Sequence, residues 1–398
     1  MSLNSVPAAE RVHIGFFGKR NAGKSSLVNA VTNQNLAIVS EIAGTTTDPV
    51  LKTMELLPLG PVVIIDTPGI DDVGELGKLR VEKSYQALAK TDVAVIVVDS
   101  SVGVGTEEEN LILKIKQKNI PYIIVYTKSD VTNLNKISDN EISVSSATGE
   151  NINELKELIA TVSKGTENEK HIISDKISSG DMLVLVVPVD KAAPKGRLIL
   201  PQQQTIRDIL DAHAMCVVTQ DDRLSDTLNA LSVTPKYVIT DSQVFGKVSK
   251  ELPENINLTS FSILFANYKG NLRLAVESVK KISEIENGDS VLIAEGCTHH
   301  RQCGDIGTVK LPALIKKYTG KTPNFEWTAG TEFPADLSKY KLIIHCGGCM
   351  LNEKEMQSRL MMAQSQNIPI TNYGTAIAYM NGILKRSLSP FPDIQALL

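Results

Sequence analysis

The feature that most constrains the fold of this chain is a glycine-rich string near its start, Gly18 to Ser25, which reads GKRNAGKS. It satisfies the pattern G-x-x-x-x-G-K-S/T and lies between an apolar segment at residues 12–18 and a predicted helix at residues 24–32. In a loop of this kind, successive backbone N–H groups and the start of the helix hold phosphate oxygens. A strand that runs through such a loop into a helix predicts an α/β fold with a mainly parallel sheet.

The alternation of strands and helices continues along the chain in three blocks. Residues 163–181 are polar with little periodicity and predict a linker after the first block. We expect a P-loop domain at residues 1–168, followed by two smaller α/β domains with mainly parallel sheets at 178–269 and 270–398. The predicted strands are residues 12–18, 62–66, 93–99, 122–126, 183–189, 216–219, 237–240, 261–265, 291–294, 342–344 and 368–371. The predicted helices are residues 24–32, 79–89, 108–118, 152–162, 202–212, 222–231, 272–285, 353–364 and 375–384.

The segment at residues 183–189 is apolar on both faces. Such a strand is either central in a sheet or buried against a partner. We therefore interpret the second block as a linking or dimerisation domain.

Charge and hydropathy exclude several classes of protein. The net charge of −4 and the sequence pI of about 6.0 do not provide the broad basic surface that nucleic-acid binding needs. The apolar runs are far shorter than the roughly 18–20 residues that span a bilayer. The first residues also lack the charged start and long apolar stretch of a signal peptide. We expect a cytoplasmic protein that binds neither nucleic acid nor membrane.

Further motifs follow the glycine-rich string in the order of a guanine-nucleotide site. Residues 66–69, Asp-Thr-Pro-Gly, supply a carboxylate on the Mg²⁺ side and a glycine N–H that can sense the γ-phosphate. A threonine of the segment 44–48, which we take as Thr46, can complete the Mg²⁺ shell. Residues 127–130, Thr-Lys-Ser-Asp, select the base, because a carboxylate accepts the N1 and N2 protons of guanine, which adenine does not offer. Residues 145–147, Ser-Ser-Ala, stand where a backbone N–H can meet the guanine O6.

Over residues 12–165 these motifs resemble the translation-factor-like GTPases, within them the group related to the tRNA-modifying and ribosome-assembly G proteins. The chain departs from the pattern at Thr127, where asparagine is usual, so we expect the loss of an amide that braces the loop. Ile70 follows Gly69 where Ras-like proteins carry a water-orienting glutamine, which predicts slow intrinsic hydrolysis. The resemblance implies that Asn21 helps to hold a K⁺ ion in place of an arginine finger. A turn hydrogen bond is the alternative role for this side chain.

These motifs give a defined set of expected site residues. Lys24 is expected to reach the β and γ phosphates, and Ser25 and Thr46 are expected to ligate Mg²⁺. The expected catalytic residues are Asn21, Lys24, Thr46, Asp66 and Gly69. The expected contacts to GTP or GDP are Gly18, Asn21, Ala22, Gly23, Lys24, Ser25, Ser26, Thr46, Asp66, Gly69, Thr127, Lys128, Asp130, Ser146 and Ala147.

A second set of residues has the side chains of a soft-metal site. Residues 297–299, Cys-Thr-His, and residues 345–349, His-Cys-Gly-Gly-Cys, each follow a predicted strand. Because the carboxyl ends of parallel strands share one edge of a sheet, Cys297, Cys346 and Cys349 can face one cavity. Thiolates favour zinc, copper(I) or an iron–sulfur cluster. The interpretations are a [4Fe–4S] cluster with one exchangeable iron, a zinc ion completed by His299 or His345, and a metal-free redox dithiol.

The pairing of a GTPase domain with C-x-H and a later H-C-x-x-C resembles the HydF family of [FeFe]-hydrogenase maturation GTPases along the whole chain. The resemblance implies that Cys297, Cys346 and Cys349 bind a [4Fe–4S] cluster. The candidates for its fourth ligand are His299, His300, His345 and Asp305. The resemblance also implies a scaffold that receives a diiron precursor from radical S-adenosylmethionine maturases and delivers it to apo-[FeFe]-hydrogenase.

We therefore predict a cytoplasmic homodimer of three-domain α/β chains that binds and slowly hydrolyses GTP and carries the cluster in its third domain. Its expected cofactors are GTP or GDP, Mg²⁺, K⁺ and a [4Fe–4S] cluster, with the diiron precursor as cargo. The alternative is an RNA-modification or ribosome-assembly GTPase with a structural zinc site. The G domain supports that alternative, and the acidic charge balance disfavours it.

Overall fold

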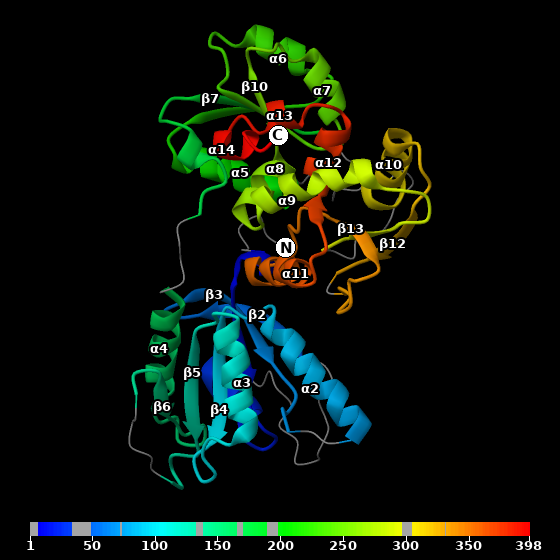
Figure 1. Cartoon of the computed structure of the whole chain (residues 1–398). Coiled ribbons are helices and arrows are strands. Elements are labelled where there is room, and N and C mark those ends of the chain that lie inside the picture. The colour runs from blue at the N-terminus through cyan, green and yellow to red at the C-terminus, as the bar shows by residue number, and fades with distance from the viewer. Residues whose placement is uncertain are drawn as a thin grey trace. The chain divides into compact units, whose positions relative to one another are not determined.

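A computed structural model describes residues 7–33, 49–71, 74–132, 138–164, 170–188, 198–296, 305–330 and 332–398 of the chain (Figure 1). The chain divides into two compact units, Met1–Asn168 and Glu169–Leu398.

The first unit is built on one six-stranded sheet with the strand order β2-β3-β1-β4-β5-β6. Its strands are parallel except for the edge strand β2, which pairs antiparallel with β3. The strands are β1 (Val12–Phe17), β2 (Val50–Leu56), β3 (Gly60–Asp66), β4 (Val93–Asp99), β5 (Tyr122–Thr127) and β6 (Glu141–Ser143). The helices are η1 (Ala8–Glu10), α1 (Lys24–Thr32), α2 (Gly74–Leu88), α3 (Thr106–Gln117) and α4 (Ile152–Lys164).

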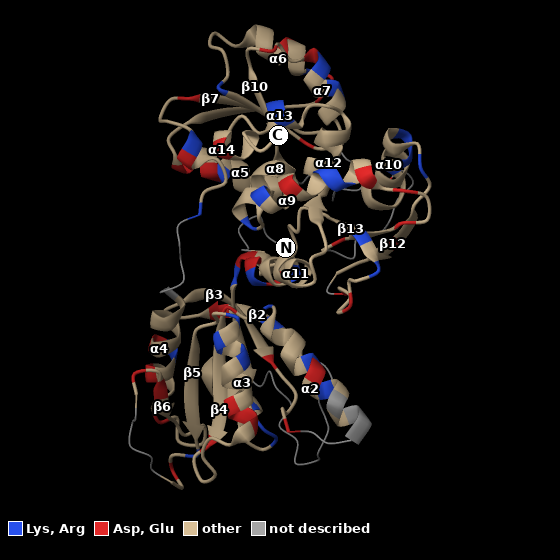
Figure 2. Cartoon of the chain, in the orientation of Figure 1, with Lys and Arg blue, Asp and Glu red and all other residues tan. Residues whose placement is uncertain are grey.

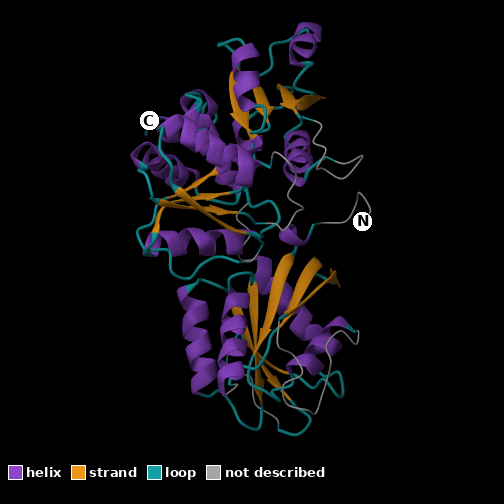
Figure 3. Cartoon of the chain, turned by 90° about the vertical axis from the view of Figure 1, so that its right-hand side faces the viewer, coloured by secondary structure: helices purple, strands orange, loops and turns teal. Residues whose placement is uncertain are grey.

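Helices cover both faces of this sheet (Figure 3). Successive residues of a central strand point to opposite faces, and the residues on both faces are apolar, so each face needs a covering layer. On one face, Val95 and Ile123 pack in a cluster with Leu27 of α1 and Leu155 of α4. On the other face, residues such as Ile96 pack in a second cluster with residues of α2 and α3. Burial on both faces is the arrangement that near-continuous apolar strands require.

The second unit contains two parallel four-stranded sheets, with the orders β10-β9-β7-β8 and β12-β11-β13-β14. The strands of the first sheet are β7 (Met182–Val186), β8 (Met215–Thr219), β9 (Tyr237–Thr240) and β10 (Asn257–Ser260). Those of the second are β11 (Ser290–Ala294), β12 (Asn324–Thr328), β13 (Tyr340–His345) and β14 (Ile370–Asn372). The helical segments are η2 (Ser174–Lys176), α5 (Leu200–Asp211), α6 (Leu224–Ala230), α7 (Phe245–Glu251), α8 (Phe261–Tyr268), α9 (Leu272–Val279), η3 (Lys280–Glu284), η4 (Ile306–Lys310), α10 (Leu311–Thr319), α11 (Glu353–Ser365), α12 (Tyr373–Met380), α13 (Leu384–Ser387) and α14 (Pro392–Gln395).

The two sheets of the second unit share one hydrophobic core. A single cluster of buried residues contains Leu185 of β7 and Ile344 of β13, together with apolar residues of the helices between them. The chain also returns from its last helices to the segment before β10 of the first of these sheets. There Arg386 of α13 donates hydrogen bonds to the carbonyl oxygens of Ser249 in α7 and of Leu252 and Ile256 in the loop that follows. These contacts join the two sheets into one compact body.

The predicted fold class, α/β with mainly parallel sheets, is confirmed. The predicted strand at residues 261–265 is wrong, because these residues begin helix α8. Ser260 caps this helix by accepting a hydrogen bond from the Ile263 N–H, and apolar residues on all its sides are buried. A short apolar run of this kind does not distinguish a buried strand from a buried helix by periodicity. The helix predicted at residues 272–285 is α9 followed by the 3₁₀ segment η3.

Candidate functional site

The phosphate loop connects β1 to α1 through two glycines that the backbone requires. A Cβ atom on Gly18 would lie 2.2 Å from the carbonyl oxygen of Val97, so this position accepts no side chain. Gly23 has a φ of 89°, which favours glycine. It precedes the first turn of α1, where no side chain caps the helix, so the N–H groups of Lys24, Ser25 and Ser26 are available to an anion.

The side chain of Lys24 lies inside the phosphate loop. It is 8% exposed, and its ammonium donates hydrogen bonds to the carbonyl oxygens of Gly18 at 2.8 Å and Lys19 at 2.6 Å. Lys19 in turn forms ion pairs with Glu107 and Glu108 in the acidic first turn of α3 (Figure 2). The loop therefore holds a buried positive charge in a fixed position.

Asp66 lies beside the phosphate loop because β3 pairs in parallel with β1, in a register that sets Asp66 opposite Phe16. Its Oδ2 accepts a hydrogen bond from the hydroxyl of Ser25 at 3.3 Å. Its Oδ1 is buried and has no hydrogen-bond partner in the part of the chain that the structure describes. Burial raises the pKa of Asp66, and the charge of Lys24 and the Ser25 hydrogen bond only partly offset this effect. A buried carboxylate oxygen beside a hydroxyl fits a Mg²⁺ ion, which prefers oxygen ligands.

Gly69 lies close to the phosphate loop. A Cβ atom on Gly69 would lie 2.9 Å from Cγ of Arg20, and the next N–H, of Ile70, donates to the carbonyl oxygen of Gly18 at 3.3 Å. The Ile70 side chain is buried. The segment after β3 is thus docked on the loop through its backbone.

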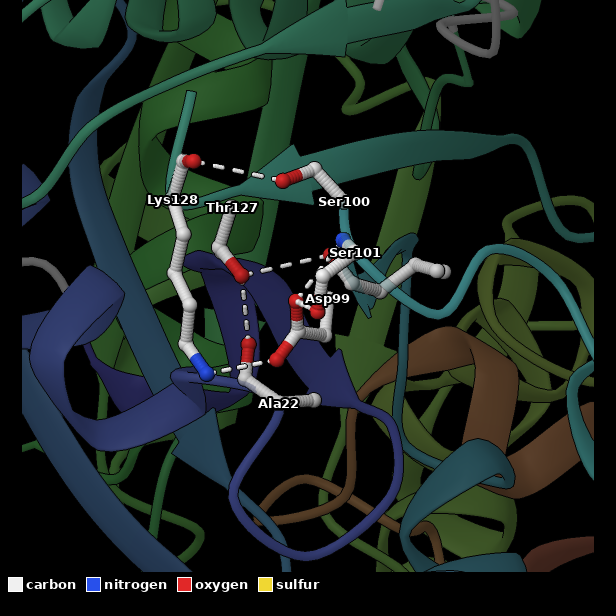
Figure 4. A network of polar contacts seen from close by, with 7 residues as sticks. Ala22, Asp99, Ser100, Ser101, Thr127 and Lys128 are labelled. Carbon is white, nitrogen blue, oxygen red and sulfur yellow. Dashed lines mark hydrogen bonds and ion pairs between the residues drawn. The ribbon is translucent and has the colours of Figure 1, made fainter. Parts of the chain in front are cut away.

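Thr127 braces the phosphate loop (Figure 4). Its hydroxyl lies 2.7 Å from the carbonyl oxygen of Ala22 and 3.2 Å from that of Val98. A hydroxyl has one hydrogen to donate, so the shorter contact, to Ala22, is the stronger one. The asparagine amide that is usual at this position is absent, as expected, and the Thr127 hydroxyl supplies a hydrogen bond to the loop in its place.

Replacing Thr127 by valine, which has the same shape but no hydroxyl, is expected to weaken the binding of both GTP and GDP by about 10-fold. The substitution leaves the buried carbonyl of Ala22 without its donor, and an unsatisfied buried acceptor costs about 1–3 kcal/mol. Equilibrium titration with a fluorescent GDP analogue measures the effect. Thr127→Ser keeps the hydroxyl and is the matched control. Equal GDP affinity of the valine and serine variants would contradict the brace.

The residues after Thr127 form the candidate base-binding segment. Lys128 has a φ of 62°, and its ammonium donates to Asp99 at the end of β4 (Figure 4). Burial favours a higher pKa for Asp99, but hydrogen bonds from Lys128 and Ser101 outweigh it and lower the pKa. This carboxylate is therefore ionised at neutral pH. The side chain of Asp130 is exposed at the same end of the sheet.

Residues 145–150 form a turn beside this segment. The N–H of Gly149 donates to the carbonyl oxygen of Ser145, and the Ser145 N–H donates to that of Glu150. The N–H groups of Ser146 and Ala147 donate no backbone hydrogen bond to any described residue. They are thus open to an acceptor such as a guanine O6.

The candidate metal centre lies at the carboxyl ends of β11 and β13, which are adjacent and parallel. The N–H of Cys346 donates to the carbonyl oxygen of Ala294 at 2.8 Å, and the N–H of Gly296 donates to Sγ of Cys346 at 3.0 Å. Cys346 and Cys349 are half-buried, reduced cysteines in one short loop, in which Gly348 has a φ of 63°. Soft, reduced thiols that are close in sequence at one sheet edge fit a thiolate-bound cluster.

His345 is held by hydrogen bonds at both ring nitrogens. Nδ1 lies 2.8 Å from the carbonyl oxygen of Cys346, and Nε2 lies 3.0 Å from Nη1 of Arg359. Because a carbonyl accepts and a guanidinium donates, Nδ1 carries the proton and Nε2 accepts. Burial and the charge of Arg359 lower the pKa of His345 to about 4, so the ring is neutral at pH 7. Binding of a metal through Nε2 would require Arg359 to give up this hydrogen bond.

Arg359 is itself buried within a polar network. Its Nη2 donates to the carbonyl oxygen of Gly330 at 2.6 Å and to Glu355 at 3.0 Å, and its guanidinium stacks 5.2 Å from the ring centre of Phe333. This network was not predicted, because Arg359 and Glu355 are ordinary residues of a helix in the sequence. The glutamate–arginine spacing of four residues was the only local signal.

Glu295 is a second group that the sequence reasoning missed. Its side chain is 3% exposed, and it accepts a hydrogen bond from the hydroxyl of Tyr373 at 3.2 Å. It follows β11 directly and stands two residues before Cys297, so a carboxylate lies at the edge of the sheet where β11 ends. The carboxylate of Asp305 accepts hydrogen bonds from the N–H and the hydroxyl of Thr308.

Several predicted site residues lie outside the described residues. They are Thr46, Cys297, His299 and His300. Among the residues that are described, no group of three or more His, Cys, Asp or Glu side chains is placed to hold a metal ion. The structure therefore places Cys346 and Cys349 in one loop after β13, and Cys297 lies outside the described residues.

Comparison with protein families assigns three segments of the chain. Residues 13–128 match the model of a 50S ribosome-binding GTPase, residues 172–270 match the hydrogen maturase F dimerization domain, and residues 273–390 match the hydrogen maturase F tetramerization domain.

Two curated relatives each match less than half of the chain. The chain is 34% identical over 182 residues to the tRNA modification GTPase MnmE of Thermosipho melanesiensis, which covers 44% of this chain and 40% of that protein. It is 37% identical over 151 residues to MnmE of Legionella pneumophila, covering 36% of this chain and 33% of that protein. The chain thus spans well under half the length of these relatives.

Two solved structures also align with part of the chain. A crystal structure of Era in complex with MgGDPNP and a fragment of 16S ribosomal RNA aligns with a TM-score of 0.35 at 22% identity, covering 56% of this chain and 98% of that one. The G domain of the FeoB iron transporter of T. maritima aligns with a TM-score of 0.29 at 26% identity, covering 38% of this chain and 99% of that one. These TM-scores are too low to support an inference about function.

The hydrogen maturase F models match residues 172–270 and 273–390, more than half of the sequence, and they follow a P-loop GTPase domain. The chain therefore belongs to the hydrogen maturase F family.

Proposed function

We propose that this protein is a GTP-hydrolysing scaffold of [FeFe]-hydrogenase maturation. In this proposal it binds a [4Fe–4S] cluster and delivers a diiron precursor to apo-hydrogenase. The observation that carries the proposal is the joining, in one chain, of a P-loop GTPase domain to both hydrogen maturase F domains. A thiolate-bound cluster needs reduced cysteines, which implies a cytoplasmic compartment.

The nucleotide-binding residues would each have a separate role in GTP hydrolysis. Lys24 would neutralise charge on the β and γ phosphates, and Ser25 and Asp66 would hold Mg²⁺, which spreads the developing negative charge. The N–H of Gly69 would meet the γ-phosphate, and Asp130 would select guanine. Because Ile70 carries no polar group to orient water, we expect hydrolysis to be slow.

We propose that Asn21 supports hydrolysis through a bound K⁺ ion. Its side chain is exposed and its φ is 59°, a backbone conformation that asparagine tolerates and that glycine adopts without strain. Turnover in K⁺ is expected to exceed turnover in Na⁺ severalfold. Asn21→Gly keeps the backbone and removes the amide, so it should lose this difference and keep its GDP affinity. Equal wild-type rates in the two salts would remove the K⁺ role.

We propose that Cys346 and Cys349, with Cys297, hold the cluster at the carboxyl edge of the second sheet. The parallel register of β11 and β13 supports this, since residue 296 contacts the sulfur of Cys346. When bound, the cluster would supply an iron position for an exchangeable ligand. The protein's own groups would orient it, with N–H groups of Gly296 and Gly348 directed at Sγ of Cys346.

We propose that two copies associate through the outer edge of β8. This strand ends its sheet, no described strand pairs with its outer side, and Met215 and Val218 are 47% and 44% exposed. An unprotected edge with apolar side chains favours pairing with another chain, and a lysine blocks it. The wild type should be a dimer or larger by light scattering at micromolar concentration, and Val218→Lys should shift it toward monomer. A monomeric wild type would contradict this role.

The proposed function is tested by maturation of apo-hydrogenase with the reconstituted, cargo-loaded protein. Hydrogen production is expected to appear only when the cargo-loaded protein is added. If GTP controls delivery, affinity for a maturase or for apo-hydrogenase must differ between GDP and a non-hydrolysable GTP analogue, because a ligand shifts an equilibrium only by its differential affinity. Equal partner affinity in both states would contradict control by GTP.

The rival is an RNA-modification or ribosome-assembly GTPase with a structural zinc site, and the similarity to tRNA modification GTPases favours its RNA-related part. That rival predicts a colourless, air-stable protein and salt-sensitive binding of RNA.

A further inference from the structure

Lys19, the second residue of the phosphate loop, contacts the start of helix α3. Its ammonium nitrogen lies 2.9 Å from Oε2 of Glu107 and 3.0 Å from Oε2 of Glu108. Hydrogen bonds with these two carboxylates raise the pKa of Lys19, so the side chain is charged at neutral pH. The contact therefore joins the phosphate loop to a helix that is distant in the sequence.

Glu108 is the buried partner of this contact. It is 2% exposed, and its Oε2 also accepts a hydrogen bond from the N–H of Gly105 at 3.0 Å. A Cβ atom on Gly105 would lie 2.6 Å from the ammonium nitrogen of Lys19, so a side chain at this position would displace the ammonium. Glu107 is half-exposed, and water weakens its attraction for the ammonium. Loss of Lys19 would leave the buried charge of Glu108 without its counterion.

Helix α3 is a rigid support for this contact. Leu111 and Ile115 are fully buried against the sheet. On another side, the ammonium of Lys114 lies 3.4 Å from the ring centre of Tyr85 in α2. A side chain that is held by such a helix is fixed more precisely than one that is held by a loop.

The backbone of Lys19 contacts the buried lysine of the phosphate loop. The carbonyl oxygen of Lys19 accepts hydrogen bonds from the ammonium of Lys24 at 2.6 Å and from the N–H of Ala22 at 3.4 Å. The side chain of Lys19 is thus held by α3, while its carbonyl holds the cation that is expected to meet the phosphates. One residue connects Glu108 to the ammonium of Lys24.

We propose that Lys19 is a positioning residue for GTP hydrolysis and acts through Lys24. Its ion pair with Glu108 holds the carbonyl oxygen that directs the Lys24 ammonium toward the β and γ phosphates. A cation that is already in place needs no rearrangement when negative charge develops in the transition state. The inference rests on the role proposed above for Lys24 and does not depend on the iron–sulfur cluster.

Lys19→Met is expected to lower the rate of GTP hydrolysis by about 10-fold or more, because displacing a reacting group by about 1 Å costs up to about 100-fold. Methionine keeps an apolar stem and removes the charge. The rate is measured under single-turnover conditions with GTP that is radiolabelled at its γ-phosphate. Lys19→Arg keeps the ion pair and should restore most of the rate. Lys118→Met, which removes an exposed lysine at the end of α3, should leave the rate unchanged.

Glu108→Gln is expected to lower the rate by a similar factor. Glutamine keeps the shape of the side chain and an oxygen that accepts the Gly105 N–H, but it has no charge to hold the ammonium. Glu109→Gln changes the exposed neighbour in α3 and should leave the rate unchanged. Thermal unfolding of each variant shows whether the fold is retained. If Lys19→Met does not fold, Glu108→Gln tests the same ion pair.

A double-mutant cycle with Lys24→Ala shows whether Lys19 acts through Lys24. Residues that act as one unit have non-additive effects, so Lys19→Met should cause no further loss when it is combined with Lys24→Ala. A further loss as large as in the wild-type background, or an unchanged rate in Lys19→Met alone, would overturn the proposal and leave the role of Lys24 intact. If Lys24→Ala alone kept the wild-type rate, the role of Lys24 would fail together with this proposal.

Discussion

Lys24→Ala is expected to lower the rate of GTP hydrolysis by at least about 100-fold, the usual effect of removing one preorganised group that stabilises transition-state charge. The side chain is buried in the phosphate loop, where its ammonium donates to two loop carbonyl oxygens. Alanine removes this ammonium group, which its hydrogen bonds to the carbonyl oxygens of Gly18 and Lys19 hold in place. Release of inorganic phosphate under single-turnover conditions measures the effect on chemistry without interference from product release.

Lys118→Ala is the matched control, because it removes an exposed lysine at the end of α3 in the same unit. Its rate should equal that of the wild type. GDP binding and thermal unfolding of Lys24→Ala separate a loss of chemistry from a loss of the loop. A rate within threefold of the wild type would contradict the role given to Lys24.

Cys346→Ser is expected to lose the iron–sulfur cluster altogether. The serine hydroxyl can still accept the N–H groups of Gly296 and Gly348, so the loop keeps its hydrogen bonds. The substitution replaces a soft thiolate with a hard oxygen, which binds iron–sulfur clusters poorly. Iron and acid-labile sulfide in the reconstituted variant should fall to background, and the EPR signal of the reduced cluster should disappear.

Cys216→Ala provides the control for Cys346→Ser. Cys216 is half-buried on β8, and burial raises the pKa of its thiol, as expected for a packing residue. This variant should assemble the cluster as the wild type does. Cys346→Ser with a full complement of iron and sulfide would remove Cys346 from the ligand set.

The parts of the fold that follow from local chemistry were predicted. The strand, glycine turn and helix around Gly18 to Ser25 are specified by consecutive residues, and the central strands are apolar on both faces. The edge strands β2 and β12 were missed, because β12 reads NFEWT and β2 reads VLKTMEL, with polar residues exposed on much of their length. An edge strand carries a weaker apolar pattern, since it buries less of its surface.

The parts that depend on distant contacts were not predicted. The hydroxyl of Thr127 braces Ala22 across 105 residues, and no local pattern reveals that contact. Arg359 reaches His345 from a helix whose sequence is mostly polar, and Lys269 is only 5% exposed although lysine usually lies at the surface. Each of these residues is of a common type, so its role follows only from the contacts that it makes in the fold.

The central claim, that this GTPase carries an iron–sulfur cluster, is tested most directly by iron and acid-labile sulfide analysis of anaerobically reconstituted protein, with EPR after reduction. The account predicts about four irons and four sulfides per chain and an S = ½ signal, as for a [4Fe–4S] cluster. One zinc per chain with no sulfide would contradict it and would leave a GTPase with a structural metal.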